Sequence, residues 1–113
     1  MSLWDVFKEP EEEAFKGRSL LSYFADLERG GVKLGVAGKI TSAQAAADCL
    51  DQGCDFVLIG RAAILHHDFP LLVQQDSDFK AVSLPVSADY LRGEGLGETF
   101  LVYMSRWKGF VEP

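Results

Sequence analysis

The sequence predicts an α/β fold in which short parallel strands alternate with helices. Between residues 19 and 75, three segments with a helical spacing of apolar residues alternate with two short apolar runs. The first run lies in VKLGVAG and begins at Val32, and the second is FVLI, residues 56–59. This order of elements is typical of βαβ units. Because the crossovers of such units are right-handed and their strands are parallel, both strands are expected to end at the same edge of the sheet.

The composition bounds the protein class before any motif is considered. The chain has 113 residues, 48% hydrophobic and 25% charged, which is ordinary for a single globular domain. It lacks a transmembrane run of roughly 18 apolar residues, and MSLWDVFKEP does not resemble a secretory signal, so a cytoplasmic protein without membrane contacts is expected. The net charge of −6 argues against nucleic acid as a partner but allows a local cationic pocket.

The first 31 residues are predicted to form a loop and one helix. Residues 5–18 mix charges, a proline and little periodicity, which is typical of a loop with a solvated acidic run. Ser19 is a plausible N-cap, and Gly30 and Gly31 are expected to end the helix that it opens. The apolar residues of this helix are Leu20, Leu21, Phe24 and Leu27.

A second helix is predicted between the two strands. Thr41 and Gln44 have the spacing of a capping box, and Gly53 is expected to end the helix. Its small apolar face comprises Ala43, Ala46, Ala47 and Leu50. The run at 56–59 that follows is continuously apolar, which predicts a parallel strand covered on both faces.

The remaining motifs are interpreted as structural. Cys49 and Cys54 have no CxxC spacing and no zinc-type histidine cluster, which favours buried thiols in a reducing compartment. The adjacent His66 and His67 are expected to point in different directions, so no metal site is predicted. Asp55 stands at the start of a strand, opposite the edge at which the two strands end, and is interpreted as structural. In the tail, one helical face is expected to pack in a core or interface; it carries Phe100, Tyr103, Met104 and Trp107.

Two glycine-containing corners follow the two predicted strands. They are Ala37-Gly38-Lys39 and Gly60-Arg61, and each leads into a helix. Glycine allows a ligand to approach backbone N–H groups closely, a helix N-terminus carries a partial positive charge, and Arg61 offers a planar fork of donors. Together they predict an anion site suited to phosphate. The alternative is that Arg61 forms an ion pair with a surface carboxylate and that the glycines only make turns.

These residues carry a resemblance to a known family. GVAGKITSAQAAADCLDQGCDFVLIGRAAILHHDFP, residues 35–70, resembles the last two βα units of flavin-binding (β/α)8 barrels, most closely those of the old yellow enzyme family. In that family a glycine pair after strand seven and a GR after strand eight hold the phosphate of FMN. Here Ala37 and Gly38 match the pair, and Gly60 and Arg61 match the GR. SLWDVF at the start is similar to the end of strand six and the loop after it.

The resemblance implies a fold and a function. The fold would be the last two or so βα units of a (β/α)8 (TIM) barrel plus a C-terminal helical tail, with a loop at 1–18, βα units at 19–75 and the tail at 76–113. The function would be FMN binding in an NAD(P)H-dependent oxidoreductase that acts on a small molecule, with FMN held by Ala37, Gly38, Lys39, Gly60 and Arg61.

The resemblance also implies what this chain lacks. The family's catalytic residues come from earlier strands, so no catalytic residue is assigned here. The chain is expected to be a part of a longer enzyme. By itself it is expected to be inactive and to self-associate. The alternatives are a non-enzymatic, oligomerising barrel piece without flavin, or part of another FMN barrel such as a dihydroorotate dehydrogenase or a 2-hydroxy-acid oxidase.

Overall fold

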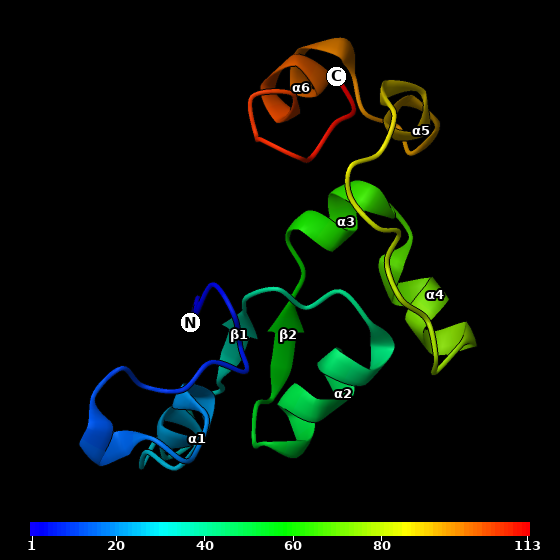
Figure 1. Ribbon diagram of the computed structural model, residues 1–113. Coiled ribbons are helices and arrows are strands. Elements are labelled where there is room, and N and C mark those ends of the chain that lie inside the picture. Colours follow the sequence, from blue (N-terminus) through cyan, green and yellow to red (C-terminus); the bar gives the residue numbers. More distant parts are fainter.

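The computed structural model describes residues 1–113 as a mixed α/β chain with six α-helices and a two-stranded parallel sheet (Figure 1). The strands are β1 (Gly35–Ala37) and β2 (Phe56–Leu58). The helices are α1 (Leu20–Ala25), α2 (Ala43–Asp51), α3 (Arg61–Leu65), α4 (Phe69–Gln75), α5 (Ala88–Gly93) and α6 (Glu98–Met104), with a short 3-10 helix at Glu13–Phe15. The predicted alternation of helices and strands between residues 19 and 75 is therefore present.

The sheet places the ends of β1 and β2 side by side. The strands are parallel, with Gly35 opposite Phe56 and Ala37 opposite Leu58. A Cβ atom on Gly35 would lie 2.2 Å from the ring of Phe56, so another residue at that position would require the Phe56 side chain to move. The α2 crossover connects the two strands and packs on one side of the sheet.

The N-terminal segment adds a third parallel stretch at the other edge of β1. Ser2 forms a parallel bridge with Ala37. The N–H of Leu3 donates to the carbonyl of Ala37 at 2.9 Å, and the N–H of Ala37 donates to the carbonyl of Met1 at 2.8 Å. Residues 1–3, which belong to the segment predicted to be a loop, thus extend the sheet. The three parallel stretches lie in the order in which they occur in the chain, with β1 in the middle.

The first helix begins where the sequence predicts and ends earlier. The hydroxyl of Ser19 accepts the N–H of Ser22, which is the expected N-cap. The helix ends at Ala25, whose carbonyl accepts a hydrogen bond from the guanidinium of Arg29 at 2.8 Å. Leu27 therefore lies beyond the helix and is 59% exposed, which corrects its assignment to the helical face.

Strand β1 and helix α2 both begin at other residues than the sequence predicts. Val32 is 70% exposed and precedes β1 by three residues. The N-cap of α2 is Ser42, whose hydroxyl accepts the N–H of Ala45, and not Thr41. The carbonyl of Thr41 instead accepts the N–H of Ala81 at 2.8 Å. The buried face of α2 consists of Ala43, Ala46 and Cys49, while Ala47 and Leu50 are exposed.

Two separate hydrophobic cores stabilise the chain. The first packs the covered side of the sheet against α1 and α2 and contains Leu3, Val6, Leu21, Val36, Ile40, Ala46, Cys49 and Cys54. The second lies in the tail and contains Leu65, Val86, Leu91, Leu101, Met104 and Phe110. Because Leu65 belongs to α3, the tail packs onto the helix that follows β2. Figure 1 shows α5 and α6 beyond α3, away from the sheet.

The other side of the sheet is open, contrary to the prediction of a strand covered on both faces. Phe56 and Leu58 are 48% and 47% exposed. The accessible surface is 7398 Å², whereas a compact chain of 12.4 kDa would expose about 6,100 Å². The radius of gyration is 16.1 Å, against about 13 Å for a compact domain of this length. None of the helices has the length and apolar character to cross a lipid bilayer.

The open sheet side predicts self-association. The excess surface of about 1,300 Å² is larger than the roughly 800 Å² that one partner buries in a stable interface. We expect light scattering to give a mass of at least twice 12.4 kDa, and Leu58→Lys to shift the protein toward the monomer. Val32→Lys, at an exposed position outside the sheet, is the control and should leave the mass unchanged. A monomeric mass for the parent at high concentration would contradict the prediction.

An ion pair joins the tail to the link between α3 and α4. Nδ1 of His67 lies 2.7 Å from Oε2 of Glu94, and the N–H of His67 donates to the same oxygen at 2.9 Å. The hydrogen bond with Glu94 raises the pKa of His67 above its ordinary value of 6.5. Partial burial raises the pKa of Glu94, but its hydrogen bonds with His67 outweigh burial and hold that pKa below its ordinary value of 4.5.

The pair predicts a pH-dependent stability. Stabilisation from His67 is complete below its ordinary pKa of 6.5 and is lost as pH rises through the raised value. Stabilisation from Glu94 is present above 4.5 and is lost as pH falls through the lowered value. We therefore expect the difference in melting temperature between the parent and His67→Asn to be largest near pH 5.5 and smaller at about pH 8.5. An equal difference at both pH values would show that the pair carries no charge-dependent stability.

Candidate functional site

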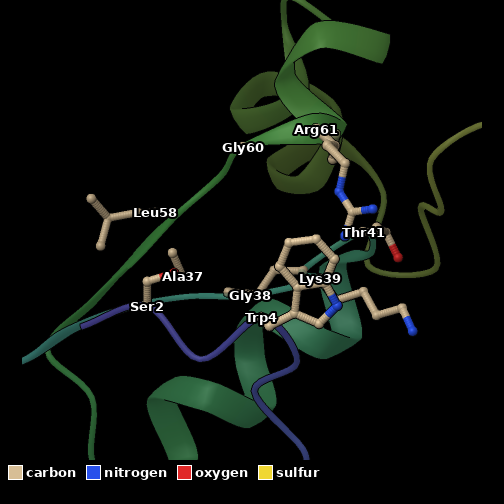
Figure 2. Close-up of a pocket in the computed structure, with 11 residues that line it drawn as sticks. Ser2, Trp4, Ala37, Gly38, Lys39, Thr41, Leu58, Gly60 and Arg61 are labelled. Atoms are coloured by element: carbon tan, nitrogen blue, oxygen red, sulfur yellow. The ribbon is translucent and has the colours of Figure 1, made fainter. Parts of the chain in front are cut away.

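A pocket of about 200 Å³ lies where β1 and β2 end (Figure 2). Its lining comprises Ser2, Trp4, Ala37, Gly38, Lys39, Ile40, Thr41, Leu58, Gly60, Arg61 and Ala62. All five residues that the sequence predicts for phosphate binding are among them. The parallel pairing of β1 and β2 brings the two corners together, although 20 residues separate them in the chain.

The corner after β1 is shaped by the N-terminal loop. Gly38 has φ +147°, and a Cβ atom there would lie 3.0 Å from the backbone of Trp4. The carbonyl of Gly38 accepts the N–H of Val6 at 3.1 Å. Lys39 follows in the left-handed region with φ +58°, as does Trp4 with φ +63°. Glycine at 38 is therefore required by both its backbone angle and the close approach of the loop.

The corner after β2 is open toward the pocket. Gly60 directly precedes α3, and a Cβ atom there would meet no atom within 4 Å. The N–H groups of Gly38, Lys39 and Gly60 donate to no other group of the chain. The first N–H groups of α3 also lack intrahelical partners, as in any α-helix. The pocket thus presents uncommitted backbone donors from both corners, which is the chemistry that binds an anion.

Arg61 carries a positive charge into this pocket without an acidic partner. Three of the other arginines, Arg18, Arg29 and Arg92, each form an ion pair with a carboxylate. Arg61 forms none, and its guanidinium lies over the ring of Trp4, 5.4 Å from the centroid. A cation–π contact of this kind orients the guanidinium while leaving its N–H groups free to donate. The alternative interpretation required a salt bridge between Arg61 and a surface carboxylate, and Arg61 forms no such salt bridge in this structure.

Lys39 contributes charge at longer range. Its Nζ lies 3.8 Å from Oδ2 of Asp5, and its side chain is 59% exposed. A pair of this length and exposure contributes little to stability. In Figure 2 the lysine side chain extends away from the corner, whereas that of Arg61 points toward Trp4.

The pocket lining contains no aspartate or glutamate. This absence is notable because the chain has 17 acidic residues against 11 basic ones. The unpaired charge of Arg61 together with free N–H groups therefore favours a positive local potential in the pocket, within a protein of negative net charge.

Trp4, Ser2 and Thr41 line the pocket but were not among the predicted site residues. Trp4 belongs to the segment predicted to be a loop, and its contact with Arg61 spans 57 positions, which no local pattern encodes. The only available signal is the likeness of SLWDVF to the end of a preceding barrel strand, which would put this tryptophan at the same sheet edge.

Other residues with reactive side chains lie outside the pocket and have structural roles. Asp55 accepts the N–H of Leu34 at 2.7 Å, and this hydrogen bond is the main reason why the pKa of its carboxyl is lowered. Burial raises the pKa of Cys49 to about 11, so the thiol stays protonated. His66 and His67 point to different partners: Nε2 of His66 accepts the N–H of Val82 at 2.9 Å.

The aromatic face of the tail is only partly buried. Leu101 and Met104 lie in the second core, but Phe100, Tyr103 and Trp107 are 43% to 47% exposed. The rings of Phe100 and Tyr103 stack with centroids 5.7 Å apart. These three aromatics are thus not core residues, and of the expected core or interface packing only the interface remains open for them. With Trp4 and Arg61 they line a hollow next to the pocket.

A comparison with models of known protein families found no match, and comparisons with curated proteins and with solved structures found none either. The geometry of the pocket is therefore the basis for any functional conclusion.

The two glycines predict different effects of alanine substitution. Gly38→Ala should lower the free energy of unfolding by about 1–3 kcal/mol, because a Cβ atom there is disfavoured by the backbone angle and meets the backbone of Trp4. Gly60→Ala should change that free energy by less than about 0.5 kcal/mol, because its Cβ atom would point into open space. Urea denaturation of both variants measures the difference, and equal losses would contradict this assignment.

Proposed function

We propose that this chain is the FMN-phosphate-binding C-terminal part of a flavin-dependent NAD(P)H oxidoreductase. The observation that carries the proposal is the guanidinium of Arg61, which has no carboxylate partner and stands beside free N–H groups at the ends of two adjacent parallel strands. A phosphate dianion would satisfy these groups together.

The chemistry of the pocket fits a phosphate ester. Arg61 would donate a bidentate pair of hydrogen bonds to phosphate oxygens. The N–H groups of Gly38 and Gly60 would donate to the remaining oxygens, and the start of α3 would add its partial positive charge. Lys39 would contribute charge at longer range. Ala37 would act through its small side chain, which leaves room at the end of β1.

Further features support the assignment of the chain to a (β/α)8 barrel. Three parallel stretches lie side by side in chain order, helices cover one side of them, and apolar residues face the other side. A barrel interior is lined by such apolar residues, and barrel enzymes often bind phosphate at the loops after strands seven and eight with a short extra helix. In this proposal the five-residue α3 would correspond to that helix.

In this proposal the flavin carries the redox chemistry. FMN would pass a hydride from NAD(P)H to a small-molecule acceptor. The residues of this chain bind and orient the phosphate end, and they supply no general acid or base at the pocket: its lining has no histidine, tyrosine, aspartate or glutamate. Catalytic groups would therefore come from other barrel strands, and the chain by itself is expected to be inactive.

A second candidate is a non-enzymatic oligomerising module without flavin. The half-exposed Phe56 and Leu58 favour it, because an apolar sheet side is a surface for association whether or not a ligand binds. Another FMN-dependent barrel dehydrogenase or oxidase would use the same phosphate corner. The first candidate and the module differ in what Arg61 does, and that difference can be measured.

The phosphate assignment predicts a selective loss in Arg61→Ala. Removing a hydrogen-bonded charge costs about 1.5–3 kcal/mol, so the affinity for FMN should fall roughly ten- to a hundredfold. The affinity for riboflavin, which has no phosphate, should change less than about twofold. Flavin fluorescence titration of the whole chain, or of the barrel it completes, measures both.

Arg106→Ala is the matched control for this experiment. Arg106 also lacks a carboxylate partner, but it lies after α6 and outside the pocket. Its removal should leave both affinities unchanged. If Arg61→Ala weakens riboflavin as much as FMN, Arg61 acts through the fold or through the flavin ring. If it weakens neither, the non-enzymatic module is favoured.

A further inference from the structure

A histidine and two carboxylates meet where the tail joins the link between α3 and α4. His67 and Asp68 are adjacent in that link, and Glu94 directly follows α5 as its C-cap. One atom from each side chain, a ring nitrogen of His67 or a carboxylate oxygen of the acids, lies within 4.8 Å of the other two. Imidazole nitrogen and carboxylate oxygen are the ligands that Zn²⁺ and similar transition-metal ions take in proteins. The three side chains therefore form a candidate metal site.

The backbone beside this cluster is held in place by other contacts. The N–H of His67 donates to Oε2 of Glu94 at 2.9 Å. One turn earlier in α5, the hydroxyl of Tyr90 donates to the carbonyl of Leu65 at 2.8 Å. Leu65 and Leu91 are both buried in the second core. An ion would thus find its ligands already close together, which lowers the cost of ordering them.

Asp68 has no structural role that would explain its place in the cluster. It stands at the N-cap of α4, where an aspartate usually accepts an N–H group of its helix, but its carboxylate makes no such hydrogen bond. It also takes part in none of the salt bridges of the chain. Instead this half-buried carboxylate lies near that of Glu94, and two like charges so placed favour the binding of a cation. The alternative is that the imidazolium of His67 alone balances both charges.

The side chains can reach the geometry of a metal site with small movements. Zn²⁺ lies about 2.0–2.2 Å from nitrogen and oxygen ligands, which places two ligands of a tetrahedral ion roughly 3.3 Å apart. Nδ1 of His67 and Oε2 of Glu94 now lie 2.7 Å apart, so an ion would separate them slightly. The side chain of His67 is 65% exposed, so no packing opposes this movement. Three protein ligands leave the fourth position of the ion to water.

We propose that His67, Asp68 and Glu94 bind a divalent transition-metal ion, for which Zn²⁺ is the best fit, and that this ion clips the tail to the segment after α3. The role is structural, because the three residues line neither the phosphate pocket nor the aromatic hollow beside it. The ligands come from segments 27 positions apart, so an ion bound to both stabilises the folded chain over the unfolded one. The inference is independent of flavin binding.

The test is a titration of the tag-free chain after all metal has been removed. Isothermal titration calorimetry with zinc chloride should show one Zn²⁺ bound per chain, and saturating Zn²⁺ should raise the melting temperature. Magnesium chloride at the same concentration should show no binding, because Mg²⁺ prefers an octahedral shell of oxygen ligands. Absence of Zn²⁺ binding, or equal binding of both ions, overturns the inference.

Asp68→Asn separates the metal site from its alternative. Asparagine is as good an N-cap as aspartate, and the Asp68 carboxylate has no contact to lose, so the metal-free variant should melt as the parent does. Its affinity for Zn²⁺ should fall by about tenfold or more, since loss of a ligand costs at least as much as loss of a group that orients one. Asp51→Asn is the matched control, because it removes the same charge from an exposed aspartate at the end of α2. It should leave the affinity unchanged.

Each remaining outcome also decides. If Asp68→Asn binds Zn²⁺ as the parent does, Asp68 is not a ligand and the inference is wrong. If Asp51→Asn weakens binding as much as Asp68→Asn, the affinity follows the net charge and the cluster is not a site. His67→Ala should lose Zn²⁺ binding as well, and the affinity of the parent in that variant would show that the ion binds elsewhere.

Discussion

The parallel pairing of β1 with β2 is the constraint on which the site depends. With Gly35 opposite Phe56 and Ala37 opposite Leu58, the residues that follow the strands emerge at the same edge. Gly38 and Gly60 then face one pocket, although 21 residues separate them. A slip of one residue in this register would exchange the covered and open sides of a strand and move one corner away from the other. The crossover helix α2 packs on the sheet and contributes Ala46 and Cys49 to the buried cluster that also contains Val36 of β1.

The tail contributes to the site through α3. Leu65 lies one helical turn after Arg61 and is buried in the second core. Its carbonyl accepts the hydroxyl of Tyr90 at 2.8 Å, which joins α5 to the end of α3. The short α3 would be marginal in isolation. Packing of the tail therefore holds the helix that carries Arg61, so the two cores form one support for the pocket.

The sequence predicted the elements and the pocket better than it predicted their limits. The order of helices and strands, the N-cap at Ser19 and the convergence of the two corners all follow from local spacing and from the geometry of βαβ units. Thr41 and Gln44 fit a capping box, which predicts Thr41 as the N-cap of α2, but the structure uses Ser42, a good N-cap residue type that has Ala45 and no Glu or Gln three positions later. Adjacent Thr and Ser residues are both good N-caps, and in the structure the carbonyl of Thr41 is engaged in a tertiary hydrogen bond with the N–H of Ala81.

The features that the sequence could not predict depend on contacts between distant segments. The pairing of residues 1–3 with β1, the contact of Trp4 with Arg61 and the hydrogen bonds of residues 79–81 to the start of α2 all join residues tens of positions apart. The exposure of Phe56 and Leu58 belongs to the same group, because a continuous apolar run does not reveal how many of its faces are covered. A fold class can be obtained from periodicity alone, whereas the walls of a pocket cannot.

The two corners after β1 and β2 differ from an ordinary pair of turns because they combine a fixed backbone with an unpaired charge. The carbonyl of Gly38 is held by the N–H of Val6, and α3 is held by the buried Ala62 and Leu65, so the backbone of both corners is fixed before any ligand binds. An exposed ion pair contributes only about 0–1 kcal/mol, so a chain with 17 acidic residues loses little by leaving Arg61 without one. A doubly charged phosphate would gain far more from the same guanidinium, because the donors around it would incur no reorganisation cost. The pocket thus has the properties of a preorganised anion site, and turns that only reverse the chain require neither the free charge nor the oriented donors.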